Sequence, residues 1–249
     1  MRIISAAPSN TEILYAIGAG SDIVGVTAFC NYPKEAKDKA KIGGWTTANI
    51  THIKKLRPDI VITSTFLQDK IAETVTKNGF KVLHVNPKTL NDVVESIVTI
   101  GRAVNKEKKA IQLVKNMKNS LGKLKVRKRR KVRIYIEEWH APAMVSGNWV
   151  PKLIEMAGGT ALINEGEISR KVSLLEIVKF NPQIIILSLC GFGSRPSTGI
   201  IYSRKNWEAV DAVAKKHVFV INDDFLNRPG PRLVLGLKYL VGISNLNIR

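Results

Sequence analysis

Short apolar runs alternate with longer amphipathic stretches along most of this 249-residue chain. The apolar runs, rich in β-branched residues, predict strands, and the stretches with apolar residues three and four positions apart predict helices. In the first half, strands are expected at residues 2–6, 23–27, 59–64 and 81–86, and helices at 10–17, 50–56, 68–78 and 90–104. In the second half, strands are expected at 132–137, 183–188 and 217–222, and helices at 150–157, 174–179, 206–215 and 231–244. This alternation predicts an α/β fold with two lobes, each a parallel sheet flanked by helices.

A long amphipathic stretch separates the two halves. Its apolar residues fall three and four apart on one helical face: Ala110, Val114, Met117, Leu121 and Leu124. One backbone helix over residues 106–128, about 34 Å long, is therefore predicted, with Gly122 as its weak point. A single narrow apolar stripe favours a strut that joins two lobes over a helix buried in one core. The expected parts are an N-terminal lobe at 1–105, the helix, and a C-terminal lobe at 129–249.

One segment of the first half is echoed in the second. Residues 53–64 and 177–188 share a pattern in which Pro58 and Pro182 each end a helix just before an apolar strand. We interpret the echo as structural duplication. The alternative is that such helix-proline-strand junctions recur in α/β proteins generally.

Charge is the most unusual bulk property, since the formal net charge is +19. Eight of the eleven residues from 123 to 133 are basic, and no aromatic residue lies among them, as a single-strand nucleic-acid site would require. We favour a solvated helix end and connector, with an anionic membrane surface and nucleic acid as alternatives. No nucleic-acid partner and no second copy of the chain are expected. Cys30 and Cys190 lie far apart and are expected to be free thiols.

Motifs of catalysis are missing from the sequence. It has no glycine-rich phosphate loop, no nucleophile elbow, no zinc-binding histidine pair and no cysteine and histidine cluster. The four histidines are far apart in the sequence. The chain is therefore predicted not to be an enzyme, with no catalytic residue and no metal site. An enzyme on the same two-lobed plan is the competing class, and Cys30 beside Phe29 is its one hint.

The loops that follow the predicted strands carry the candidate binding residues, because open α/β sheets bind ligands at the carboxyl ends of their strands. Ser9 and Glu12 have capping-box spacing, which predicts a helix N-terminus at this edge. Trp45, Trp139 and Trp149 fall in such loops, where aromatic side chains stay exposed unless a ligand covers them. A large, flat, partly apolar ligand held between the lobes is expected. His140 either ligates a metal in that ligand or bonds within its loop.

Several short motifs together resemble one family. They are Ser5-Ala-Ala-Pro-Ser-Asn-Thr-Glu12, Asn31-Tyr-Pro33, Asn49-Ile50, Leu56-Arg-Pro-Asp59, Val145-Ser-Gly147, Gly158-Gly159, and residues 224–228 followed by Pro231-Arg232. Through them the chain resembles the helical-backbone solute-binding proteins of ABC transporters, and most closely their cobalamin-binding members.

The resemblance implies a corrinoid or related tetrapyrrole as transported ligand, no intrinsic cofactor, and an ABC permease as partner. Haem or a ferric siderophore is the alternative ligand. The ligand-binding residues expected from the loops and the resemblance are Ser9, Asn10, Phe29, Trp45, Thr46, Phe66, Trp139, His140, Trp149, Asp224, Phe225, Leu226, Asn227 and Arg228. Asp69 and Glu208 are expected to dock on the permease. The resemblance implies an extracytoplasmic location, periplasmic or membrane-associated, whereas residues 1–9 show no signal-peptide pattern and leave a cytoplasmic location open.

Overall fold

The computed structural model describes residues 1–126 and 131–246. The chain forms two compact units. The first consists of residues 1–87 and 91–117, and the second of residues 88–90 and everything from 118 onward. The lobe boundaries expected at 105 and 128 stay a prediction.

A five-stranded parallel sheet forms the centre of the first unit, with the strand order β3-β2-β1-β4-β5. Its strands are β1 (Ile3–Ser5), β2 (Ile23–Val26), β3 (Ala40–Lys41), β4 (Ile60–Ser64) and β5 (Val82–Val85). The helices are α1 (Pro8–Ala16), α2 (Ile50–Leu56), α3 (Asp69–Lys77) and α4 (Leu90–Ala103), with short 3-10 turns η1 (Gly20–Asp22), η2 (Lys34–Asp38) and η3 (Phe66–Gln68). These elements confirm the alternation read from the sequence.

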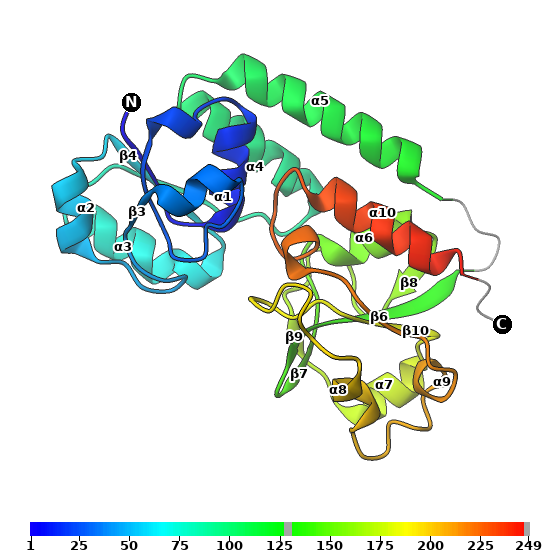
Figure 1. Cartoon of the computed structure of the whole chain (residues 1–249). Helices are drawn as coiled ribbons and strands as arrows, with labels where there is room; N and C mark the ends of the chain where they lie inside the picture. The colour runs from blue at the N-terminus through cyan, green and yellow to red at the C-terminus, as the bar shows by residue number, and fades with distance from the viewer. Residues whose placement is uncertain (127–130, 247–249) are drawn as a thin grey trace. The chain divides into compact units, whose positions relative to one another are not determined.

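The core of the first unit is built on both faces of this sheet. On one face, Ile4 and Val61 pack with Ile53 of α2 and with Ile71 and Val75 of α3. On the other face, α1 packs on β1 and β4 (Figure 1). Each fully buried branched side chain contributes about 1.5–3 kcal/mol of transfer free energy. Because helices cover both faces, the strands are apolar runs without alternation.

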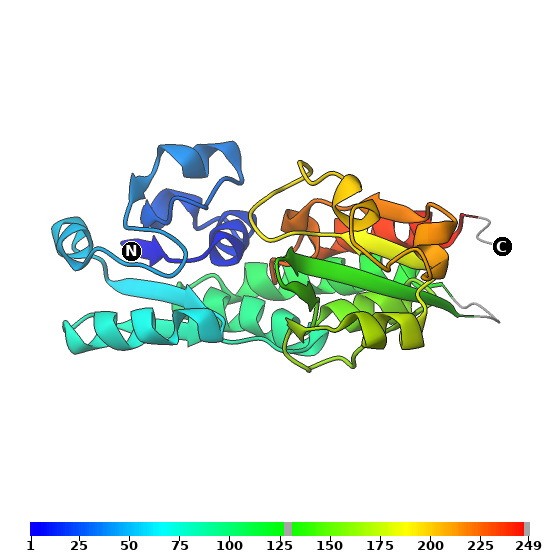
Figure 2. The same cartoon turned by 90° about the horizontal axis from the view of Figure 1, so that it is seen from below.

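The second unit contains a six-stranded sheet in the order β11-β10-β6-β7-β9, with β8 paired to β6. Its strands are β6 (Val132–His140), β7 (Ala143–Val145), β8 (Gly159–Ala161), β9 (Arg170–Lys171), β10 (Ile184–Leu187) and β11 (Val218–Val220). The helices are α6 (Val150–Met156), α7 (Leu174–Phe180), α8 (Gly199–Tyr202), α9 (Asp211–Ala214) and α10 (Leu233–Ser244), with a 3-10 turn η4 (Asp223–Phe225). In Figure 2 the long green strand β6 runs through this unit with β10 beside it.

This second sheet is mixed, whereas a parallel sheet was expected. Strand β6 does not end at Glu137 but continues to His140. The chain then turns back at residues 141–142, so that β7 pairs antiparallel to β6, and β9 pairs antiparallel to β7. A hairpin can be closed by a two-residue turn, whereas a parallel partner needs a long crossover. Trp139 and His140 are therefore strand residues and not loop residues.

Helices cover both faces of the second sheet. Figure 1 shows α6 and α10 on one side and α7, α8 and α9 on the other. On the second side, Tyr135, Ile185 and Leu187 of the sheet form one buried cluster with Ile177 of α7 and with Trp207. The arrangement brings the carboxyl ends of β6, β10 and β11 to one edge of this unit, since these three strands are parallel.

Helix α5 spans Glu107–Leu124 and is shorter than the predicted stretch of 106–128. Ala110, Met117 and Leu121 are buried, which confirms the predicted apolar stripe. The helix ends where the Lys125 amide bonds to the carbonyls of Leu121 and Gly122, and the Val126 amide then bonds to Met156 of the second unit. Positions 127 and 128 of the predicted helix lie outside the described residues.

The echoed segments form the same junction in both units. Helices α2 and α7 each end in a left-handed residue, Arg57 and Asn181, both with φ of 44°. A proline and a buried strand follow. In each unit an arginine of the neighbouring strand segment holds the junction, since Arg2 donates to the Leu56 carbonyl and Arg133 Nε donates to the Asn181 carbonyl. The shared geometry extends beyond the sequence pattern and supports duplication.

None of the helices within residues 1–126 and 131–246 is both long and apolar enough to cross a membrane.

Candidate functional site

The loops at the carboxyl edge of the first sheet form the candidate site of the first unit. All five strands are parallel, so the segments that follow β1, β2, β3 and β4 leave the sheet at the same edge. They include Phe29, Trp45, Thr46 and Phe66. Thr46 is exposed and Trp45 is half-buried. The structure thus places four of the predicted residues at one edge.

Gln68 ties three of these loops together, although nothing in its sequence context singled it out. It is fully buried, and its Oε1 accepts a hydrogen bond from the Ser64 amide at 2.8 Å. Its Nε2 donates to the carbonyls of Ala6 at 2.7 Å and Trp45 at 2.8 Å. One amide side chain therefore satisfies backbone groups at the end of β4 and in the segments that follow β1 and β3. The sequence feature that could have indicated this role is a glutamine two residues after an aromatic residue in a strand-to-helix turn. That feature is too common to be diagnostic.

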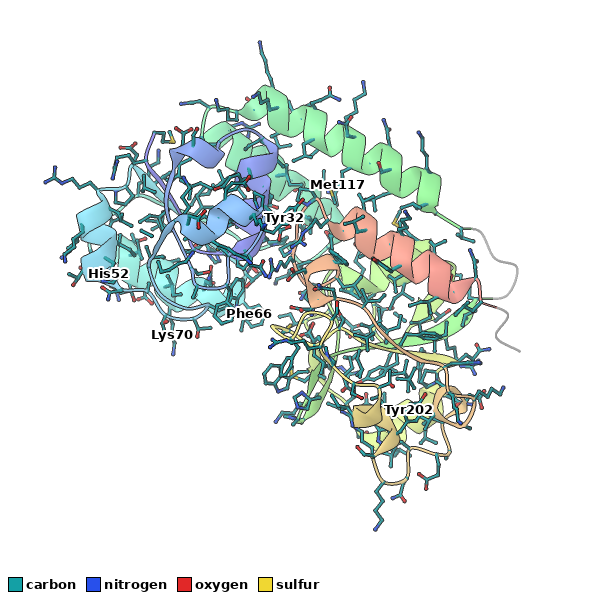
Figure 3. The ribbon with its side chains drawn as sticks, viewed as in Figure 1. Tyr32, His52, Phe66, Lys70, Met117 and Tyr202 are labelled. Carbon is teal, nitrogen blue, oxygen red and sulfur yellow. The ribbon has the colours of Figure 1, made fainter. Side chains whose placement is uncertain are left out.

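Aromatic rings at this edge are exposed to solvent. Phe29 is 48% exposed and Phe66 is 41% exposed. Tyr32, 49% exposed, belongs to a motif that supported the resemblance but was missed as a site residue. Figure 3 shows Tyr32 and Phe66 on one side of this unit and His52 on the opposite side. Large apolar side chains left uncovered at one edge are typical of a binding surface.

Ser9 and Asn10 are present at the edge but are not available as predicted. They are 2% and 1% exposed, and Asn10 Nδ2 donates to the Ile62 carbonyl at 3.3 Å. The capping box expected for Ser9 is wrong, because α1 begins at Pro8 with Ala7 as its N-cap and no side-chain cap. Proline suits the first helical position, where no amide hydrogen is needed, and it moves Ser9 inside the helix.

In the second unit a network of polar contacts holds the loops after β10 and β11. Buried Asp223 accepts hydrogen bonds from the amides of Gly191 at 2.8 Å and Gly193 at 2.6 Å. Asn227 Nδ2 donates to the Ser188 carbonyl at 2.7 Å and to Cys190 Sγ at 3.1 Å. Asn227 was predicted to contact ligand, but its amide nitrogen is used in fixing the loop. Asp223 was missed because its neighbour Asp224 matched the family motif.

An aromatic cluster lies at the end of β6. Trp139 is 39% exposed, and its ring centroid lies 6.3 Å from that of Phe192 in an edge-on contact. The His140 ring lies 5.7 Å from Phe192, also edge-on. Trp139 and His140 were predicted, and Phe192 joins them from the loop after β10. The three rings offer an aromatic surface that is already packed and oriented.

A charged group lies in the segment that follows β11. The carboxylate of Asp224 pairs with Arg228 and with Arg232 at 3.2 Å. The Arg232 guanidinium carbon lies 5.4 Å from the centre of the Phe225 ring, which stacks on Tyr239 at 5.7 Å. The structure thus brings together three predicted residues, Asp224, Phe225 and Arg228. Guanidinium groups are strong donors to carboxylate and carbonyl oxygens, so this group suits an anionic or carbonyl-rich ligand edge.

Two predicted ligand contacts, Trp149 and Leu226, have buried side chains. Trp149 is 3% exposed, and its indole Nε1 donates to the Leu226 carbonyl at 2.7 Å. Leu226 is fully buried. Helix α6 starts at Val150 with Pro151 as its second residue, so Trp149 is its N-cap and the ring is buried at the helix start. Both side chains therefore pack inside the unit, and the Trp149 indole holds the backbone of the loop after β11 at Leu226.

At the carboxyl edge of the second sheet, the pKa values of Glu138 and Cys190 are raised above their ordinary values. Burial raises the pKa of Glu138 to about 7, against the opposing effect of a hydrogen bond with Ser169. Burial of the sulfur, with the Glu138 charge second, raises the pKa of Cys190 to about 12, although the residue as a whole is exposed. The sulfur itself is covered by Asn227, whose Nδ2 lies 3.1 Å away. An uncharged thiol is a poor nucleophile.

We expect a Glu138→Gln variant to be more stable than wild type above pH 7, by up to about 3 kcal/mol. The folded-state pKa lies above the ordinary value of 4.5, so the folded protein binds the proton more tightly and loses stability as pH rises through 7. Gln mimics the protonated acid at every pH. Urea denaturation at pH 8 and pH 4.5 measures the difference, which should fade at the lower pH. A gain that is the same at both pH values, or shared by Glu155→Gln, would contradict the assignment.

The two expected docking acids lie on the surface of their units. Asp69 opens α3, its side chain is 64% exposed, and Oδ1 lies 3.1 Å from His84 Nε2. His84 Nδ1 in turn lies 2.8 Å from Thr63 Oγ1. Glu208 is exposed in the segment between α8 and α9. Asp69 thus lies next to a strand residue, a neighbour that the sequence did not predict.

Histidine, cysteine, aspartate and glutamate residues do not gather into a group of three that could hold a metal within the described part of the chain. His52 is exposed on α2. Its Nδ1 lies 3.2 Å from the Lys41 carbonyl. Cys30 is buried with Thr11 and Thr27 oxygens 3.1 and 3.2 Å from its sulfur. The feature that did suggest catalysis, Cys30 beside Phe29, is therefore a packed thiol.

Comparison with known proteins matches residues 3–225 to a family model described as periplasmic binding protein. An uncharacterized ABC transporter substrate-binding lipoprotein of Bacillus subtilis is 31% identical, with 96% of this chain and 78% of the relative covered. The vitamin B12-binding protein of Vibrio cholerae is 26% identical, with 93% and 84% covered.

Among solved structures, a possible iron-binding protein of Staphylococcus epidermidis has a TM-score of 0.82 and 28% identity, and 98% of each chain is covered. The periplasmic heme-binding protein HutB of Vibrio cholerae has a TM-score of 0.84 at 17% identity, with 98% of this chain and 99% of that chain covered. At that identity the likeness concerns the fold alone.

Proposed function

Because the chain belongs to the periplasmic binding protein family of ABC transport systems, we propose that it captures a corrinoid, a cobalamin-like ligand, and delivers it to a permease. The observation that carries the proposal is the pair of aromatic edges. Each unit presents exposed rings at the carboxyl ends of its strands, with Phe29 and Phe66 in the first and Trp139 in the second. The family is one of solute-binding transport proteins, and its members named here are not enzymes.

A corrinoid suits these edges on chemical grounds. Its macrocycle is broad and apolar on its faces, and its rim carries amides. Aromatic rings cover such faces, while Thr46 and the group of Asp224 and Arg228 offer polar partners for the rim. Polar partners then select among ligands, because a rim group that is buried without a partner costs about 1–3 kcal/mol. The vitamin B12-binding relative supports this choice of ligand class.

Haem is the second candidate. His140 Nδ1 is buried and makes no hydrogen bond within the described residues, and its ring stands in the aromatic cluster. An imidazole placed there is a suitable ligand for iron, and Arg228 and Arg232 would pair with propionates. A ferric siderophore, as an anionic ligand, would use the same arginines.

Delivery to a permease requires surfaces as well as a ligand. We propose that Asp69 and Glu208 dock on permease arginines, with His84 holding Asp69 in place. We further propose an extracytoplasmic location, since the relatives include a lipoprotein, and a monomeric state.

Calorimetric titration of the purified protein with cobalamin, cobinamide and haemin tests the ligand class. We expect Trp45→Ala to weaken corrinoid binding at least about tenfold, about 1.4 kcal/mol, because it removes a ring at the edge. Tyr202→Ala removes an exposed aromatic ring of α8 and is the matched control, with no expected change. Binding of haemin alone would select the second candidate. No binding of any of the three would refute the proposal.

A further inference from the structure

We propose that the solvent-facing side of helix α5 adsorbs to an anionic membrane surface. The adsorbing surface is defined by Lys108, Lys115, Lys118 and Lys123, and is called the α5 lysine face below. Adsorption of this kind uses charge on the helix and does not depend on which ligand the protein carries.

The α5 lysine face is confined to one side of the helix. At about 100° per residue, its four lysines fall within one half of the helix circumference. They share that half with Gln112, Asn116 and Asn119, and all seven residues are exposed. Ala110, Met117 and Leu121 lie on the opposite side and are buried. In Figure 3 the side chain of Met117 marks this buried side.

Negative charge is missing from this face. Glu107 is the one acidic residue of α5, and it pairs with Arg102 at 2.7 Å. Among the described residues, no carboxylate lies within ion-pair distance of the four lysines. Residues 106–133 contain thirteen basic residues and one acidic residue, so this stretch carries about two thirds of the +19 net charge. Most of the positive surplus of the sequence therefore belongs to α5 and the segment that follows it.

A lipid surface fits this face better than nucleic acid does. Nucleic-acid sites combine cations with stacking rings or with a groove that follows the phosphates, and α5 contains no aromatic residue. The phosphates of a lipid surface lie in one plane, and the α5 lysine face presents its cations on one side of the helix. The helix presents just one exposed large apolar residue, Ile111, which is 52% exposed, so adsorption should be electrostatic without deep insertion. Substrate-binding proteins of ABC transporters also deliver their cargo at a membrane.

The test is co-sedimentation of the full chain with vesicles of phosphatidylcholine and phosphatidylglycerol in equal parts, and with phosphatidylcholine alone. Each lysine near an anionic surface is worth a factor of about five in partitioning. A variant with Lys108, Lys115, Lys118 and Lys123 all changed to Gln should therefore bind the mixed vesicles more than a hundredfold less tightly. Raising salt from about 0.1 M to about 1 M shortens the Debye length from about 10 to 3 Å and should release wild type.

A matched control removes the same charge elsewhere. Lys37, Lys54, Lys55 and Lys81 are exposed and lie outside α5, and their change to Gln should weaken binding less than about tenfold. Circular dichroism melts check that both variants fold. Three results would each overturn the proposal: equal losses in the two variants, equal binding of wild type to neutral vesicles, or tighter binding of wild type to a random DNA duplex than to mixed vesicles at the same salt.

Discussion

Replacing Arg204 by Ala should destabilise the protein by about 3–5 kcal/mol, the largest effect expected of a single substitution here. Arg204 makes two contacts of 2.7 Å to the carboxylate of Glu137, which is fully buried on β6. Removing the guanidinium leaves that carboxylate buried without its positive partner, with the Tyr135 hydroxyl as a donor at 2.9 Å. Arg204 also donates to the His140 carbonyl at 3.1 Å, so the aromatic cluster loses a support.

Urea denaturation at pH 7 measures this loss. The double variant Arg204→Met with Glu137→Gln removes both charges and keeps an acceptor for Tyr135, and it should recover more than half of the stability. The surface pair Arg170 and Glu176, 2.9 Å apart and 44% and 40% exposed, is the matched control, and Arg170→Ala should cost no more than about 1 kcal/mol. Equal losses of unfolding free energy in Arg204→Ala and Arg170→Ala would contradict the larger contribution assigned to the buried pair.

A Gln68→Leu substitution should cost about 3 kcal/mol and weaken ligand binding as well. Leucine fills a similar volume but leaves the Ser64 amide and the Ala6 and Trp45 carbonyls without their partner, and each unpaired buried group costs about 1–3 kcal/mol. Loss of the Trp45 contact frees the loop that presents its ring. Both denaturation and titration with corrinoid should therefore respond.

The control for Gln68 is Gln112, an exposed glutamine of α5 that bonds Asn116 at 2.9 Å. Gln112→Leu should change stability by less than about 0.5 kcal/mol and leave binding unchanged. Unchanged ligand affinity in a folded Gln68→Leu protein would refute the role of Gln68 in presenting Trp45.

Most of the fold was predictable because it depends on local patterns. An apolar run such as Ile60–Ser64 predicts a buried strand in a sheet that is covered by helices on both faces. The extension of β6 to His140 was not predictable, because Glu138 and His140 are polar residues that look like a loop. Their place in a strand depends on pairing with β7, which is a tertiary contact.

The sequence predicted which loops form the candidate site better than it predicted which of their side chains are exposed. Phe29, Phe66 and Trp139 are exposed as expected, because aromatic residues at or just beyond the ends of strands have little core to enter. Trp149 looked equivalent in the sequence, but Leu226, 77 residues away, supplies the carbonyl that satisfies its indole. Gln68, Asp223 and Arg204 act through backbone groups and buried charges, which leave no pattern in a single sequence.

The junction of helix, proline and strand that occurs in both units bears on how the chain folds. Each copy is closed by an arginine from another strand segment of the same unit, 54 residues from Leu56 in the first unit and 48 residues from Asn181 in the second. Loop-closure entropy grows only slowly with the length of the loop, so these contacts remain accessible within one unit. Each junction is therefore complete once the residues of its own unit are present. A chain emerging from the ribosome can begin to order residues 1–64 before the second junction has been synthesised.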